Sequence, residues 1–198
     1  LFLWTGTVRD PADPAAPANV RNENVDYEDE ASWTTFPERL EKAGIPWKIY
    51  QNEISLSTGL SDEEEPWLSN FTDSPMEWFS QYRVRFHPAY YNHISQEVKI
   101  LPARIAEMEK KLSALSSSDA AYAPAKKKLD EQKEWANMVQ SDLVRYAPEN
   151  FDKLTEFEKN LHRKAYTTNT GDPDYRKLTP MVYQDGATER RVNIPKGD

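Results

Sequence analysis

The chain has 198 residues, a formal net charge of −8 and a mean hydropathy of −0.85. This acidity argues against a nucleic-acid partner, because nucleic acids are bound through basic surfaces that displace counterions. The absence of cysteine excludes disulfides, thiolate metal sites and a cysteine nucleophile, and the sequence holds no apolar run long enough for a transmembrane segment.

Residues 1–8 are predicted to form a buried strand. Leu1–Trp4 is continuously apolar, and Thr5–Thr7 follows it as a Thr-Gly-Thr turn. Since the chain lacks an initiator Met and starts inside this apolar segment, we expect both ends to be cut from a longer protein. Residues 9–32 contain three prolines and an acidic patch, and they are predicted to be a surface loop.

Residues 33–50 carry the signals of a short helix that is followed directly by a strand. Thr34 or Thr35 supplies an N-cap hydroxyl, and Gly44 suits the left-handed turn that ends a helix. Trp47–Tyr50 is then predicted to be a strand. A helix that leads so closely into a strand is typical of an open α/β sheet, which binds ligands at the carboxyl ends of its strands.

The middle of the chain has the spacing of two amphipathic helices. Apolar residues recur at intervals of three and four from Ile94 to Leu115, and they share one stripe again from Ala125 to Tyr146. Because Ser116–Asp119 is a turn between them, the pair is predicted to form an antiparallel helical hairpin. Pro102 either kinks the first helix or marks its true start. A third helix is expected at about 151–166.

The C-terminal part contains a strong β-hairpin signal. Asp185-Gly186 lies between two segments with strand character, at 177–184 and 189–194. The chain is therefore divided into an α/β sheet portion with long loops at 1–91, an inserted helical hairpin with a third helix at 92–166, and a loop and β-hairpin that return to the sheet at 167–198.

No group of residues has the spacing of a known catalytic or metal-binding motif. The three histidines, at 87, 93 and 162, lack the helical i, i+4 pair of a metal site. The acidic patches at 26–30 and 62–65 lack the alternating ligands and the glycine of a calcium loop. Structural or surface histidines and solvated carboxylates are the favoured interpretation, with a metal role for histidine as the weaker alternative.

Trp78, Tyr82 and Phe86 share one face if their segment is helical. Aromatic faces hold quaternary ammonium groups such as choline by cation–π attraction. Packing in the core is the favoured interpretation, because aromatic side chains dominate core packing in general.

The order of several segments along the chain resembles a bacterial phosphoesterase family. This family contains the phosphatidylcholine-hydrolysing phospholipases C and related acid phosphatases. Together the segments cover most of the chain, and the helical middle is the least specific part. The segments that carry the resemblance are Leu1–Thr7, Trp33–Tyr50, Ser61–Trp67, Trp78–Phe86, Lys164–Pro173 and Ile194–Asp198.

The resemblance implies an alkaline-phosphatase-like α/β fold in which a Ser or Thr nucleophile and a divalent metal cleave phosphate esters. In the family pattern the nucleophile and one metal site precede Leu1, and the other metal site follows Asp198. No catalytic and no metal-binding residue is therefore assigned to this chain. It is expected to be the central portion of the enzyme, inactive in isolation. The family is largely exported, so we expect a periplasmic or secreted protein.

Residues at the predicted strand ends are the candidates for the border of a substrate site. The resemblance implies a phosphodiesterase that acts on phospholipid headgroups, phosphatidylcholine first, while the headgroup, the metal and monoesterase activity stay open. The candidate residues are Thr5, Gly6, Thr7, Tyr50 and Asn52.

The alternative is a non-enzymatic interaction module in which the helical hairpin, at about 92–147, binds a partner. An exposed apolar stripe would favour this alternative, because a stripe that both helices leave uncovered marks an interaction surface. The residues that decide are Leu112, Leu115, Val139 and Leu143.

Overall fold

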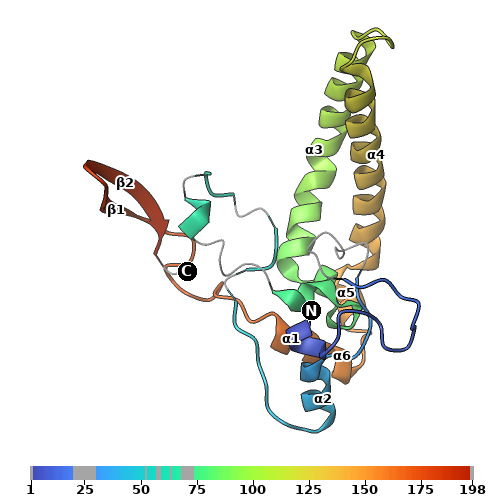
Figure 1. Ribbon diagram of the computed structural model, residues 1–198, viewed down its shortest axis with the longest axis vertical. Helices are drawn as coiled ribbons and strands as arrows, with labels where there is room; N and C mark the ends of the chain where they lie inside the picture. Colours follow the sequence, from blue (N-terminus) through green and yellow to red (C-terminus); the bar gives the residue numbers. More distant parts are fainter. Residues whose placement is uncertain are drawn as a thin grey trace. The chain divides into compact units, whose positions relative to one another are not determined.

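The computed structural model describes residues 2–19, 30–51, 53–56, 59–62, 64–67 and 74–196 (Figure 1). Internal contacts divide the chain into two units, residues 1–84 with 154–198, and residues 85–153. The described elements, with η marking a 3-10 helix, are α1 (Phe2–Thr5), α2 (Phe36–Lys42), η2 (Glu65–Trp67), η4 (Pro75–Trp78), η5 (Ser80–Tyr82), η6 (Val84–Phe86), α3 (Pro88–Ser113), α4 (Tyr122–Arg145), α5 (Pro148–Phe151), α6 (Glu156–Ala165), β1 (Leu178–Asp185) and β2 (Thr188–Pro195).

Helix α2 begins and ends where the sequence predicts. Thr35 is the N-cap residue, and its backbone N–H donates to Glu38 Oε2 at 2.9 Å, which satisfies an amide that the first turn leaves unpaired. Gly44 has a φ of 67°. Its left-handed conformation lets the Ile45 N–H donate to the Leu40 carbonyl at 2.9 Å and close the last turn.

We expect Gly44→Ala to lower the free energy of unfolding by about 1 kcal/mol, because a Cβ is strained in the left-handed region. The added Cβ has no atom within 4 Å, so strain is the only cost. Gly171→Ala is the matched control, since its surroundings are equally open and its φ lies outside that region. Equal effects of the two substitutions in chemical denaturation would contradict this assignment.

The predicted strand at residues 1–8 is wrong for the described residues. Phe2–Thr5 is a short helix, α1. Backbone amides must be paired, and a helix pairs them locally where no described strand lies alongside. The family resemblance requires this segment and residues 47–50 to pair side by side as parallel strands, and the described part of the chain does not form that pairing.

The predicted strand at Trp47–Tyr50 is reduced to one parallel bridge, between Tyr50 and Thr167. The Ile49 N–H donates to the Lys164 carbonyl at 2.8 Å. The neighbour of this segment is thus the end of α6, where the backbone is helical up to Ala165. A helical neighbour has no free row of carbonyls, so the ladder stops after one bridge.

The predicted C-terminal β-hairpin is confirmed. Strands β1 and β2 pair antiparallel from Leu178 with Pro195 to Asp185 with Thr188 (Figure 1). Gly186, with a φ of 61°, lies in the connecting turn. The β1–β2 hairpin is the only sheet of more than one residue pair among the described residues. The fold class shown is therefore a mixed helix and sheet structure.

The core of the first unit is built around aromatic side chains. Phe79 and Tyr82 are fully buried, and Trp33 packs its edge on Phe79 at a centroid distance of 5.8 Å. Core packing, the favoured interpretation for Trp78, Tyr82 and Phe86, is confirmed for Tyr82, whereas Trp78 and Phe86 are half-buried. The segment is a series of 3-10 turns, η4 and η5, rather than one helix. Other buried apolar residues of this unit are Ala31, Ile54, Met76, Val84, Leu161, Ala165, Tyr166 and Val192.

The second unit is the predicted helical hairpin of α3 and α4 (Figure 1). Helix α3 starts at Pro88, after the N-cap His87, and runs through Pro102, which therefore does not mark its start. The interaction-module alternative requires an apolar stripe that faces solvent. None of its four test residues is exposed, because Val139 is buried and Leu112, Leu115 and Leu143 are half-buried. The packing weighs against the interaction-module alternative.

Polar contacts join the two helices beside this apolar seam. Trp135 Nε1 donates to Glu97 Oε2 at 3.1 Å, and Lys133 pairs with Glu109 at 2.7 Å. Neither of these helices, nor any other helix in the described ranges, is long and apolar enough to cross a membrane. The predicted division into three parts stays a prediction.

Candidate functional site

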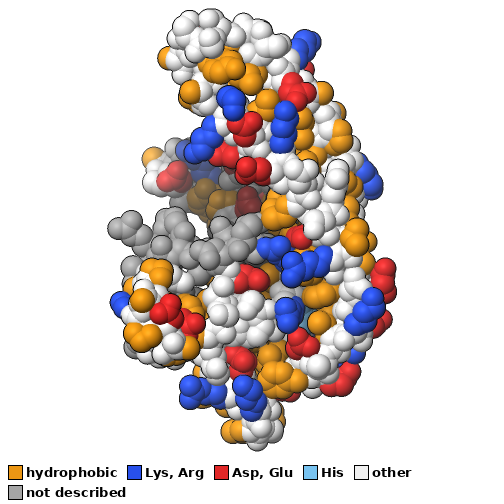
Figure 2. All heavy atoms as spheres, turned by 90° about the vertical axis from the view of Figure 1, so that its right-hand side faces the viewer, with side chains coloured by type: hydrophobic (Ala, Val, Ile, Leu, Met, Phe, Trp, Pro, Cys, Tyr) orange, Lys and Arg blue, Asp and Glu red, His pale blue; other side chains and the backbone are white. Residues whose placement is uncertain are grey.

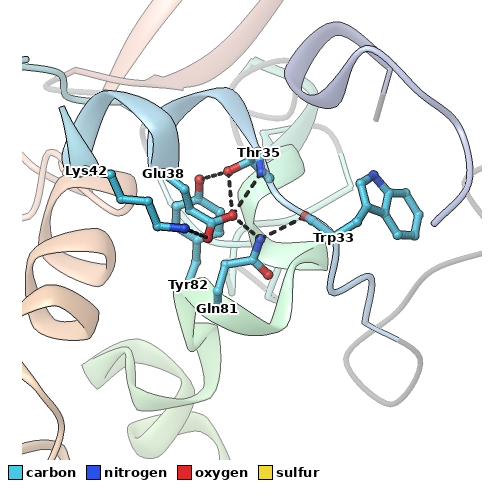
Figure 3. Close-up of polar contacts among 6 residues, drawn as sticks. All are labelled: Trp33, Thr35, Glu38, Lys42, Gln81 and Tyr82. Atoms are coloured by element: carbon cyan, nitrogen blue, oxygen red, sulfur yellow. Dashed lines mark hydrogen bonds and ion pairs between the residues drawn. The ribbon is translucent and has the colours of Figure 1, made fainter. Parts of the chain in front are cut away.

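The most informative segment of the sequence, residues 33–50, takes part in a group of polar contacts that we call the Tyr82 cluster (Figure 3). Thr35 Oγ1 and Tyr82 OH are hydrogen-bonded. Gln81 Nε2 donates to Glu38 Oε2 at 2.7 Å and to the Trp33 carbonyl at 3.1 Å. The cluster therefore fastens α2 to η5. Its members are Thr35, Glu38, Gln81 and Tyr82.

Most of the Tyr82 cluster is closed to solvent, and only Gln81 is half-buried. Thr35 and Tyr82 have no exposed surface, and Glu38 is 8% exposed. Burial raises the pKa of Tyr82, and the hydrogen bond with Thr35 offsets only part of this effect, so the phenol stays protonated at neutral pH. A phosphoester does not reach these groups, and the cluster can position α2 but cannot act on a substrate directly.

His162 on α6 contacts the backbone of Tyr82. Its Nδ1 lies 3.0 Å from the Tyr82 carbonyl oxygen, and its ring packs edge-on to Tyr166 at 5.0 Å. Burial lowers the pKa of His162 to about 4, against the opposing effect of backbone hydrogen bonds at Tyr82 and Arg83. The imidazole is neutral at pH 7, with Nδ1 as donor, because a carbonyl only accepts. The interpretation of this residue as a structural histidine is confirmed.

Glu41 forms a second tie between α2 and α6. Its carboxylate accepts hydrogen bonds from Trp47 Nε1 at 2.7 Å and from Lys164 Nζ. Burial by itself would raise the pKa of Glu41, but these two bonds and the charge of Lys164 outweigh it and lower the pKa. The negative charge is therefore retained at neutral pH, and Trp47 is fixed against the helix end.

A third polar group, around Glu53, holds the loop that precedes β1. Tyr175 OH donates to Glu53 Oε1, and Arg176 forms an ion pair with Glu53 Oε2. Arg176 has a φ of 62°, a left-handed conformation that non-glycine residues rarely adopt. Sequence reasoning missed this group, because the partners lie 122 and 123 positions apart and no local pattern connects them.

The predicted border residues lie on two segments. Thr5 Oγ1 donates to the Thr7 carbonyl at 2.6 Å around Gly6, whose φ is 71°, so the three residues form a local turn. Tyr50 is 76% exposed, with Lys48 Nζ 5.4 Å from the centre of its ring. Asn52 lies outside the described residues. A substrate-bordering role for these residues stays a prediction.

The described residues do not fit the divalent metal that the resemblance implies. Across residues 2–19, 30–51, 74–196 and the short described stretches between them, no three His, Asp or Glu side chains are grouped closely enough to hold a metal ion. The acids of the three polar groups are already paired with Lys42, Lys164 and Arg176. We therefore derive no reaction step through a metal on this chain.

Comparison with known proteins identifies the family. The model of the family described as "Phosphoesterase family" matches residues 1–116, which is more than half of the chain. The chain therefore belongs to this family.

Two curated relatives are both called non-hemolytic phospholipase C. The relative from Burkholderia pseudomallei is 35% identical over 88 residues, which are 41% of this chain and 11% of the relative. The relative from Pseudomonas aeruginosa is 39% identical over 86 residues, 42% of this chain and 10% of that protein. The match thus spans about a tenth of either relative's length. No solved structure matches the chain significantly.

Proposed function

We propose that this chain is the central portion of a phospholipase C-like phosphoesterase that hydrolyses the phosphodiester bond of phospholipid headgroups, phosphatidylcholine first. The family match over residues 1–116 carries the proposal, and the names of the two relatives support the substrate class. The nucleophile and the ligands of a divalent metal belong, in this proposal, to parts of the protein outside these 198 residues. Resemblance to the family supports export and an alkaline-phosphatase-like open sheet in the complete protein.

In this function the first unit serves as a scaffold. The Tyr82 cluster and the Glu41 tie fix α2 between η5 and α6, and the Glu53 group fixes the loop before β1. Side chains locked by buried hydrogen bonds hold their neighbours in one geometry, which is what a phosphoryl-transfer site requires of its supports. Thr5, Gly6, Thr7, Tyr50 and Asn52 are proposed to line the approach to that site.

We expect the isolated chain to show no turnover of p-nitrophenylphosphorylcholine with added zinc, calcium, magnesium or manganese. Phosphoryl transfer needs a positioned nucleophile and positive charge at the reacting phosphate, and the described residues hold no group of three His, Asp or Glu side chains that could bind a metal ion there. The complete protein is expected to release p-nitrophenol from the same substrate.

Release of p-nitrophenol by the purified chain, lost on chelation of the metal, would refute the assignment of the reactive groups to other parts of the protein. A complete protein that cleaves neither this diester nor p-nitrophenyl phosphate would refute the phosphoesterase function itself. Cleavage of p-nitrophenyl phosphate alone would replace the diesterase assignment by a monoesterase.

A further inference from the structure

The turn end of the helical hairpin concentrates positive charge within an acidic chain. Residues 110–128, which we call the hairpin tip, contain five lysines and a single acid, Asp119, whereas the whole chain has a net charge of −8. All five lysines are exposed. They are Lys110 and Lys111 at the end of α3, and Lys126, Lys127 and Lys128 in the second turn of α4.

The acids that pair with these lysines lie one turn farther from the tip. Lys126 contacts Asp130 at 2.8 Å, and Lys111 and Lys127 contact Glu107 and Glu131 at 3.6 Å each. These acids offset the charge of three of the five lysines, although exposed i, i+4 pairs contribute little to stability. Within the described part of the chain, Lys110 and Lys128 form no ion pair.

Helix stability does not explain this arrangement at the start of α4. The N-cap residue is Ala121, without a side-chain hydrogen bond, and the first turn holds no acid. Helix N-termini are stabilised by Ser, Thr, Asp or Asn caps and by acidic side chains, and α4 has lysines as its first charges instead. The backbone caps this end instead, since the Tyr122 N–H donates to the Asp119 carbonyl at 3.0 Å.

An open groove of about 390 Å³, lined by apolar and polar side chains, lies beside the turn between α3 and α4. Figure 2 shows hydrophobic side chains near the top of the view, with Lys or Arg side chains beside and below them and Asp or Glu side chains interspersed. Leu112, Leu115 and Tyr122 are only half-buried. The lining residues are Glu109, Leu112, Ser113, Leu115, Ser117, Tyr122 and Leu129.

We propose that the hairpin tip docks on the surface of an anionic phospholipid bilayer. The lysines contact the anionic headgroups, and Leu115 and Tyr122 enter the boundary between headgroups and acyl chains. A mixture of Lys and apolar side chains on one short surface is the composition of interfacial membrane contacts, and each Lys near an anionic surface strengthens binding. The overall acidity of the chain opposes this attraction, but screening limits its reach to about 10 Å at ordinary ionic strength.

The proposal goes beyond the hydrolytic function, since docking needs no turnover. The test is sedimentation of the purified 198-residue chain with vesicles of phosphatidylcholine alone, or with one quarter phosphatidylglycerol. We expect binding to the anionic vesicles only, weakened by added salt. Lys110→Gln, Lys127→Gln and Lys128→Gln together are expected to lower the partition coefficient about 100-fold, roughly fivefold for each lysine.

The matched control replaces Lys99, Lys153 and Lys177 by Gln, which removes the same charge from exposed positions outside the tip. This variant is expected to bind within about twofold of the unchanged chain, because charges beyond a Debye length are screened. Circular dichroism checks that both triple variants keep the helices of the unchanged chain.

Absence of binding to anionic vesicles at low salt would overturn the proposal, as would equal losses in the two triple variants. Equally strong binding to pure phosphatidylcholine would exclude the lysines as the basis of docking. Self-association that the tip substitutions abolish, without vesicle binding, would assign the tip to a second copy of the chain. Failure of the complete protein to hydrolyse p-nitrophenylphosphorylcholine leaves each of these readouts unchanged.

Discussion

Acidification from pH 6.5 to pH 4 is expected to remove roughly 3 kcal/mol from the free energy of unfolding, through His162 alone. The pKa of this imidazole falls from the ordinary 6.5 to about 4 on folding, because burial disfavours the charged form. Between these two values the unfolded chain binds a proton that the folded chain does not. Stability contributed by neutral His162 is therefore complete above pH 6.5 and is lost as the pH falls toward 4.

The diagnostic window is pH 5 to 6.5. Glu41, Glu97 and Glu158 also have lowered pKa values in the folded chain, from the ordinary 4.5, so their contributions are lost only at still lower pH. Urea denaturation at half-unit steps of pH measures the slope, and a flat profile across this window would contradict a buried neutral histidine.

His162→Asn is the informative variant. Its amide nitrogen can replace Nδ1 as the donor to the Tyr82 carbonyl, but it does not titrate. The variant is expected to be less stable at pH 7, because the smaller side chain leaves space beside Tyr166, and to lose the slope between pH 6.5 and 5. His93→Asn, a half-buried histidine on α3, is the control and should keep the slope.

Removal of the Asp142 carboxylate is expected to destabilise the helical hairpin by roughly 3 kcal/mol. Asp142 lies on α4 with 3% of its surface exposed. Its Oδ2 accepts a hydrogen bond from Tyr90 OH at 2.6 Å and contacts Arg85 Nη1 at 3.3 Å. The Arg85 side chain is itself only 12% exposed, so Asp142→Ala leaves a largely buried guanidinium without this counter-charge.

Two further variants separate charge from packing. Asp142→Asn keeps an oxygen that can accept from Tyr90 but removes the charge, and it should lie between the unchanged chain and Asp142→Ala. Asp130→Ala is the matched control, since Asp130 pairs with Lys126 at the surface and is expected to leave stability nearly unchanged. Thermal unfolding followed by helical circular dichroism compares them. Equal melting temperatures for Asp142→Ala and Asp130→Ala would show that the buried pair does not stabilise the hairpin.

Local sequence signals predicted the helix ends and turns whose geometry depends on only a few neighbouring residues. The cap at Thr35, the left-handed Gly44 and the Asp185-Gly186 turn each depend on backbone geometry that one or two side chains favour. The two stripes of α3 and α4 were predictable for a related reason, since a short polar link makes neighbouring helices pack on each other. The family resemblance also followed from the order of segments, and the match over residues 1–116 confirms it.

The strands predicted at 1–8 and 47–50 failed because a strand is completed by a neighbour that its own sequence does not specify. An apolar run such as Leu1–Trp4 suits a strand only when another strand lies beside it, and the described residues 2–5 form α1 instead. Segment 47–50 lies beside the residues that follow α6, where Tyr50 forms one bridge with Thr167. The candidates Thr5, Gly6, Thr7, Tyr50 and Asn52 were chosen from those strand ends, so their role depends on packing that the sequence pattern did not contain.

The sequence by itself determined the family, the helical hairpin, the β-hairpin and the extent of α2, because each is encoded in contiguous residues or in their order. Only the tertiary structure decided the pairing of Glu41 with Lys164, of Glu53 with Arg176 and of Asp142 with Arg85. It also decided the burial that holds His162 neutral. These partners are distant along the chain, and the charge state of each depends on solvent exclusion, a property that arises only when separate segments pack together.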